Sequence, residues 1–95
     1  MNTNLQVDRY FRSSSFYLSV FLFSKGLELV NIERFDPRKS NFVFRDVPER
    51  EFWVNQFNFA SEDSPDVCVD VRKIVSAIKM LKDKLYQGNF GEGVR

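Results

Sequence analysis

The sequence predicts a single small α+β domain, in which helices pack on one face of a three-stranded, mainly antiparallel sheet. Its 95 residues, 43% of them hydrophobic, suffice for one core. The apolar positions repeat at helical spacing in some segments and alternate at strand spacing in others, with turn-forming residues between them. The element order expected along the chain is α-β-β-α-β-α.

The first helix is expected over residues 14–25. The serines Ser13 to Ser15 offer N-cap hydroxyls before a wide apolar stripe, and Lys25 with Gly26 supplies a cationic last turn and a C′ glycine. The preceding residues 1–12 are mostly polar, and we expect them to form an N-terminal arm of uncertain order.

A β-hairpin is expected next. Residues 27–35 alternate in polarity, and residues 41–45 are a second run rich in β-forming residues. Between them, Asp36 and Pro37 suit the first two positions of a type I turn. The two strands should therefore pair in an antiparallel hairpin.

A second helix is expected to start near Asp46. Asp46 and Glu49 resemble a capping box, and Pro48 falls in the first turn. The turn-rich residues 61–65 end this helix. One of its faces carries Phe52, Trp53, Gln56 and Phe57.

The last third of the chain predicts a short strand and then a long helix. Residues 67–71 alternate valine with polar residues, as a strand does. Asp70 can then cap a helix over residues 70–86, whose apolar stripe is Val71, Ile74, Val75, Ile78, Leu81 and Leu85. Several glycines predict a flexible C-terminal tail over residues 88–95, so that the folded domain spans residues 13–87.

Several short motifs resemble a known family. They are Phe16-Tyr17-Leu18, Phe21-Leu22, Lys25-Gly26, Leu29-Val30, Glu33-Arg34, Phe42-Val43-Phe44, Val69-Asp70, Leu81-Lys82 and Leu85-Tyr86. In this pattern residues 13–87 resemble a family of small bacterial and phage proteins catalogued only as a domain of unknown function. The resemblance implies a bacterial or phage origin and a cytoplasmic setting, and it implies no activity.

Scarce residue types exclude most enzyme chemistry. The chain has no histidine and no glycine-rich phosphate loop, and its acidic group Glu62, Asp63 and Asp66 lacks the spacing of a calcium loop. We therefore expect no enzyme activity, no cofactor, no metal site and no small-molecule substrate. The single Cys68 is typical of a reducing compartment, which favours the cytoplasm. The longest apolar stretch, residues 16–23, is far shorter than the ~20 residues that span a bilayer, so we expect no membrane contact.

The charges are unevenly distributed, and the hairpin is basic. Residues 46–70 hold one basic and seven acidic side chains, whereas the segments on either side have an excess of basic ones. Basic residues interleaved with aromatic ones can bind phosphates and stack on bases, although hairpin tips are often basic only for solubility. The candidate nucleic-acid site is Arg34, Phe35, Arg38, Lys39, Phe42 and Arg45.

Phenylalanine is unusually frequent. The chain has eleven, and Phe11, Phe35 and Phe59 fall outside the main apolar stripes, which makes them candidate interface residues. The alternative is that they fill the rim of a small core. The sequence therefore predicts a non-enzymatic interaction module that forms homo-oligomers or binds a protein partner. The second prediction is a nucleic-acid-binding accessory protein that uses the hairpin.

Overall fold

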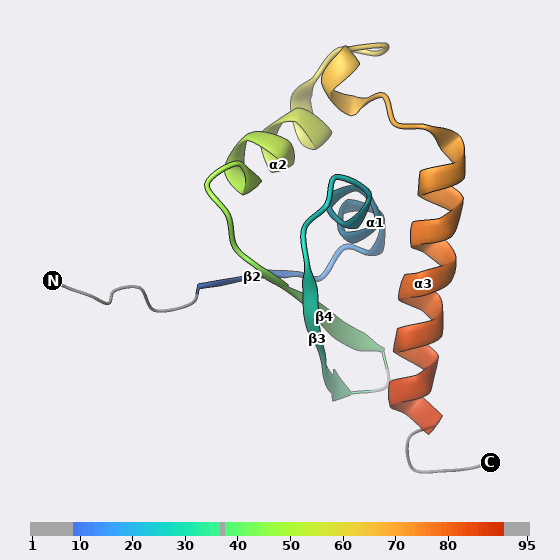
Figure 1. Cartoon of the computed structure of the whole chain (residues 1–95). Coiled ribbons are helices and arrows are strands. Elements are labelled where there is room, and N and C mark those ends of the chain that lie inside the picture. Colours follow the sequence, from blue (N-terminus) through green and yellow to red (C-terminus); the bar gives the residue numbers. More distant parts are fainter. Residues whose placement is uncertain (1–8, 37, 91–95) are drawn as a thin grey trace, which may run out of the picture.

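The structure, a computed structural model, describes residues 9–36 and 38–90. Its elements, shown in Figure 1, are β2 (Tyr10–Ser13), α1 (Phe16–Ser24), β3 (Leu29–Asp36), β4 (Lys39–Arg45), α2 (Arg50–Phe59), the 3₁₀ turn η1 (Pro65–Val67) and α3 (Val71–Phe90). The predicted α+β class and three-stranded antiparallel sheet are confirmed. The order of strands and helices is β-α-β-β-α-α, so the expected α-β-β-α-β-α order is corrected.

The third strand comes from the N-terminal side of α1, and the prediction of a strand over residues 67–71 is wrong. Strand β2 pairs with β4, so that the sheet order is β2-β4-β3 and both edges of β4 are occupied. After α2, Pro65 begins a 3₁₀ turn, and the Ser64 hydroxyl caps it by accepting a hydrogen bond from the Asp66 N–H at 3.4 Å. This turn and the start of α3 leave too few residues between them for a strand.

Part of the expected N-terminal arm belongs to the sheet. Tyr10 lies opposite Arg45 and Phe11 lies opposite Phe44 in the β2–β4 pair. Residues 1–8 of the arm lie outside the described residues.

Helix α1 is shorter than the predicted residues 14–25, and Lys25 caps it instead of forming a cationic last turn, but the predicted serine cap and C′ glycine are present. The Ser15 hydroxyl accepts a hydrogen bond from the Leu18 N–H at 3.2 Å. Gly26, just past the helix, has a φ of 104°, the left-handed conformation that suits a C′ glycine. The middle of the helix is buried, and the Ser19 hydroxyl is satisfied there by donating to the Ser15 carbonyl at 2.7 Å.

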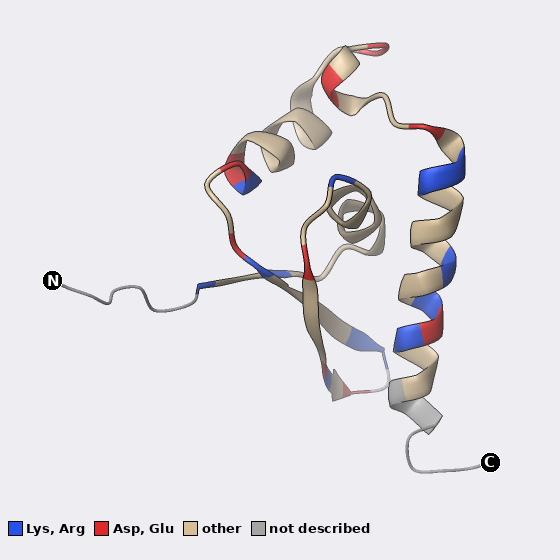
Figure 2. Cartoon of the chain, viewed as in Figure 1, with Lys and Arg blue, Asp and Glu red and all other residues tan. Residues whose placement is uncertain are grey.

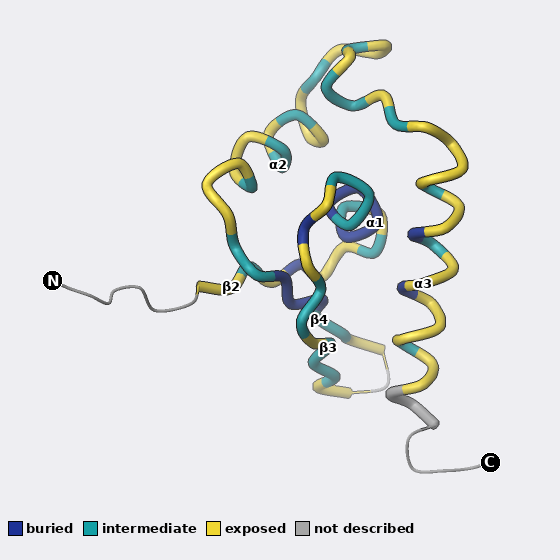
Figure 3. Tube along the Cα trace, in the orientation of Figure 1, coloured by how far each residue is buried: buried dark blue, intermediate teal, exposed yellow. Residues whose placement is uncertain are grey.

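The core lies where α1, β4 and α3 meet. Phe42 and Phe44 on β4 pack against α1, and Ala77 and Leu81 on α3 complete the cluster. Figure 3 shows these buried segments facing one another. Helix α1 lies between α2 and α3, and α1 and α3 cover one face of the sheet, as predicted (Figure 1).

The other face of the sheet is polar. Val43 points away from Phe42 and Phe44, yet it is buried. Its neighbour across the sheet, Arg12, forms a two-pronged ion pair with Glu33, in which Nε to Oε1 is 3.1 Å and Nη2 to Oε2 is 3.3 Å. This pair joins β2 to β3 across β4, on the face of the sheet that also carries Val43.

The predicted capping box at the start of α2 is wrong. Glu49 precedes the helix without a side-chain cap, and the Asp46 carboxylate is used differently. It accepts two hydrogen bonds from the Arg50 guanidinium, at 3.0 and 3.2 Å, and one from the Val47 N–H at 2.9 Å. The Arg50 guanidinium lies 4.3 Å from the centroid of the Phe11 ring. The pair therefore ties the start of α2 to β2 and to the end of β4.

Helix α3 is capped as predicted and is longer than predicted. The Asp70 carboxylate accepts a hydrogen bond from the Arg72 N–H at 2.8 Å. The helix continues to Phe90, so residues 88–90 belong to it and not to a tail. Residues 91–95 of the expected tail lie outside the described residues.

Replacing Leu81 with alanine should destabilise the domain by about 2–5 kcal/mol, because a buried leucine leaves a cavity when it is truncated. Leu81 is 0% exposed. The neighbouring Met80 is 45% exposed, so Met80→Ala is the matched control on the same helix and should cost less than about 1 kcal/mol. Urea denaturation of both variants measures the difference. Equal losses would contradict the placement of Leu81 in the core.

The Asp46–Arg50 pair should make stability depend on pH. Hydrogen bonding to Arg50 lowers the pKa of Asp46 from its usual value. The pair therefore stabilises the folded state above about pH 4, and this contribution disappears as the pH falls through the lowered pKa. At neutral pH, Asp46→Asn should reduce the free energy of unfolding by about 1 kcal/mol. Denaturation curves across acidic pH should show that the difference in the free energy of unfolding between wild type and Asp46→Asn shrinks as the pH falls. A difference that stays constant would exclude the Asp46–Arg50 pair as its cause.

Candidate functional site

The structure separates the six residues predicted as a nucleic-acid site. Phe42 is 3% exposed and belongs to the core, so its predicted role in stacking on a base is wrong. Arg45 lies three residues further along β4, and an odd spacing in a strand places two side chains on opposite faces of the sheet. Its guanidinium forms an ion pair with Glu28 at 3.1 Å and lies 5.8 Å from the centroid of the Tyr10 ring.

The other four predicted residues remain together near the turn of the hairpin, and we call Arg34, Phe35, Arg38 and Lys39 the hairpin tip. Phe35 lies where the strand register shifts, as in a β-bulge, and it is 68% exposed. The Asp36 carboxylate accepts hydrogen bonds from the N–H groups of Arg38, at 2.7 Å, and Lys39, at 3.0 Å. This capping orders the turn and leaves both basic side chains exposed.

The three predicted interface residues have different environments. Phe59, the last residue of α2, is 81% exposed, and Phe35 is also exposed. Phe11 is partly buried beneath Arg50 and packs against the core. The rim-of-core alternative therefore applies to Phe11, and the structure leaves Phe35 and Phe59 available for contacts.

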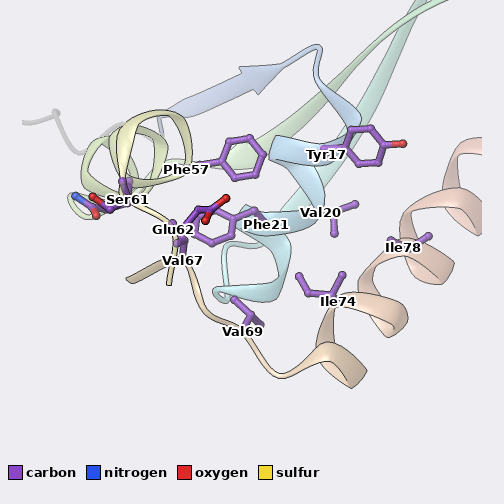
Figure 4. Close-up of a pocket in the computed structure, with 12 residues that line it drawn as sticks. Tyr17, Val20, Phe21, Phe57, Ser61, Glu62, Val67, Val69, Ile74 and Ile78 are labelled. Atoms are coloured by element: carbon purple, nitrogen blue, oxygen red, sulfur yellow. The ribbon is translucent and has the colours of Figure 1, made fainter. Parts of the chain in front are cut away.

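A groove of about 430 Å³ lies between the three helices and the segment around η1. Figure 4 shows Val20 and Phe21 of α1 between Phe57 of α2 and the side chains of Ile74 and Ile78 on α3. These five side chains are apolar. The groove is therefore suited to an apolar occupant.

Aromatic contacts hold α2 against α1 on one side of the groove. The ring centroid of Phe21 lies 5.3 Å from that of Phe57 and 6.4 Å from that of Trp53. The Lys25 ammonium, at the end of α1, lies 4.4 Å from the centroid of a ring of Trp53, in a cation–π contact. The contacts of α2 are thus concentrated on the side that faces α1.

The rim of the groove combines an exposed aromatic residue with carboxylates. Tyr17 of α1 lines the groove and is 72% exposed. Glu62 also lines it, near Phe21 in Figure 4. Asp63 and Asp66 follow Glu62 in the chain without lining the groove, and we call these three carboxylates the acidic rim. Within the described part of the chain, no Lys or Arg forms an ion pair with these three carboxylates. Figure 2 shows acidic residues before α3 and basic residues along it.

The groove was not predicted from the sequence, because its residues come from three helices and a turn. The sequence nevertheless contained one indication of this groove. The apolar stripe predicted for the last helix includes Val71 and Val75, and both are exposed in the structure. That stripe is wider than α1 and the sheet can cover, which indicates a surface left open for another partner.

Side chains that could bind a metal ion are dispersed in the described part of the chain. Nowhere in the described part of the chain do three His, Cys, Asp or Glu side chains gather closely enough to hold a metal. Glu28 and Glu33 lie in ion pairs with arginines of the sheet. No described helix is long and apolar enough to cross a membrane.

Comparison with known proteins identifies a family and no characterised relative. No curated protein and no solved structure matches the chain. The sequence profile of the family described as Domain of unknown function (DUF5659) matches residues 8–87. The match covers most of the chain, from the segment around β2 to α3, and confirms the resemblance to a domain of unknown function. This chain therefore belongs to the DUF5659 family.

Proposed function

We propose that this domain is a non-enzymatic protein-interaction module that associates with itself through the apolar surface around the groove. The observation that carries the proposal is the composition of α2. This helix contains three phenylalanines, a tryptophan and a valine, and none of its residues is buried. A ten-residue helix so rich in aromatic residues is suited to packing on both sides.

The exposed apolar residues continue beyond α2. Tyr17 on α1 lines the groove and is exposed. Phe59 on α2, and Val71 and Val75 on α3, are exposed on helices whose other residues line the groove. Covering one such aromatic side chain completely would contribute about 1.5–3 kcal/mol. Several of them around one groove support a protein partner rather than isolated surface residues.

The absence of a candidate catalytic group among the described residues supports a non-enzymatic role. Glu49 and Glu51 are exposed at the start of α2. Glu28 and Glu49 line one pocket, but Glu28 forms an ion pair with Arg45, and Glu33 forms one with Arg12. No two of these four carboxylates line the groove. We further propose a bacterial or phage cytoplasm as the setting, on the motif resemblance and the single exposed Cys68.

Exchanging Phe59 and Tyr17 for serine should weaken self-association without unfolding the domain, because both side chains are mostly exposed. Light scattering over a range of concentrations up to high micromolar gives the mass, and circular dichroism verifies the fold. Phe35→Ser is the matched control, since it removes an equally exposed aromatic ring at the hairpin tip. A wild-type chain that stays monomeric would refute self-association, and a larger effect of Phe35→Ser would move the interface to the hairpin.

We also propose a second function, contact with single-stranded nucleic acid through the hairpin tip. The exposed Phe35 beside the exposed Arg38 and Lys39 favours it, because a ring can stack on a base while cations bind phosphates. The buried Phe42 and the paired Arg45 reduce the size of this surface.

Salt dependence tests the second function. Each phosphate contact with a single strand contributes about −0.7 to the slope of log affinity against log salt. Replacing Arg38 and Lys39 with alanine should therefore flatten the slope by about 1 to 1.5, with little change in melting temperature, because Asp36 orders the turn through backbone N–H groups. Fluorescence anisotropy with a labelled oligonucleotide provides the measurement. An unchanged slope would exclude the hairpin tip as the binding surface.

A further inference from the structure

One flank of α3 combines exposed apolar residues with lysines. The flank consists of Val71, Val75, Lys79, Lys82 and Tyr86, whose spacing of three and four residues places them on one side of the helix. All five are exposed, and the flank borders Ile74 and Ile78, which line the groove. In the described part of the chain, neither lysine forms an ion pair.

The acidic rim precedes the same helix in the chain. Asp66 lies five residues before the first residue of α3 and Glu62 nine, and Glu62 lines the groove. The chain thus carries an acidic surface before α3 and a basic, partly apolar surface along α3 (Figure 2). In the described part of the chain, these three carboxylates and the two lysines form no ion pair within the same copy.

We infer that the occupant of this surface is a second copy of the chain, whose α3 flank packs antiparallel on the first. This inference rests on the proposed self-association. A two-fold axis beside Val75 places Val75 against the equivalent valine of the second copy. It also places Val71 against the aliphatic part of Lys79 of the second copy. The same symmetry brings Lys82 of each copy to residues 66–70 of the other, the segment before α3 that begins with Asp66 of the acidic rim.

Charge complementarity selects the antiparallel arrangement. A parallel pair would place the lysines of one copy beside the lysines of the other, and the acidic rims beside each other. The antiparallel pair replaces both repulsions with two equivalent attractions between lysines and carboxylates. The apolar residues Val71 and Val75 lie between these charged regions, which matches an apolar interface centre with a polar rim.

Two charge-reversed chains test the inference. Lys79→Glu with Lys82→Glu makes the flank acidic, and Glu62→Lys with Asp66→Lys makes the rim basic. Each variant alone should dimerise at least about tenfold more weakly than wild type, because like charges meet at both contacts. An equimolar mixture should form heterodimers, since both contacts are then between opposite charges. Native mass spectrometry with one chain isotopically labelled distinguishes heterodimers from homodimers.

The control places the same charge change on another side of α3. Lys73 and Lys84 border other elements, near Phe23 of α1 and near Leu29 of β3 respectively. The variant with both Lys73→Glu and Lys84→Glu should dimerise as tightly as the wild-type chain. Circular dichroism melts of all variants establish that each is folded.

The possible outcomes separate this inference from the proposed function. A monomeric wild-type chain would overturn both. A wild-type dimer whose two charge-reversed variants fail to form heterodimers, or whose control weakens as much as Lys79→Glu with Lys82→Glu, would overturn the α3 arrangement alone. Heterodimers in the mixture, with an intact control dimer, would establish it. As a second measurement, Val75→Cys in a Cys68→Ser chain should form a disulfide-linked dimer on oxidation, because Val75 lies beside the axis.

Discussion

The burial of α1 is the constraint on which the rest of the structure depends. This helix is apolar on every side, so it has to be covered from several directions at once. The sheet covers it through Phe42 and Phe44, α3 covers it through Ala77 and Leu81, and α2 covers it through the contacts of Trp53 and Phe57 with Phe21. Helices α2 and α3 are therefore positioned largely by their contacts with α1, whereas β2 and β3 are positioned by pairing with β4.

This arrangement explains why apolar surface remains exposed. Helices α2 and α3 both pack on α1 from different sides, so a groove opens between them, and a ten-residue α2 contacts α1 with one side only. The hydrophobic side chains left around the groove would be unfavourable in a chain that never meets a partner. The same packing that buries the apolar side chains of α1 thus creates the surface on which the proposed interaction depends.

One face of the sheet, unlike α1, is not covered by any described helix. This second face carries charged side chains instead. The Arg12–Glu33 pair spans the sheet above Val43, and Arg45 pairs with Glu28 beside it. Because these arginines are already paired with carboxylates, the basic character of the hairpin in the sequence does not become a continuous basic surface. The exposed tip around Phe35 is what remains of it.

The sequence by itself determined the features that depend on neighbours along the chain. The α+β class, the hairpin, the caps at Ser15 and Asp70 and the glycine after α1 follow from local spacing and backbone preference. The third strand could not be found in this way, because the pairing of β2 with β4 joins residues 29 to 35 positions apart, and local alternation favoured residues 67–71 instead. Local spacing also did not determine the groove or how far each phenylalanine is buried. Phe11, Phe42 and Phe59 are alike in the sequence, and only the tertiary packing decided which is covered by Arg50, which lies in the core and which faces solvent.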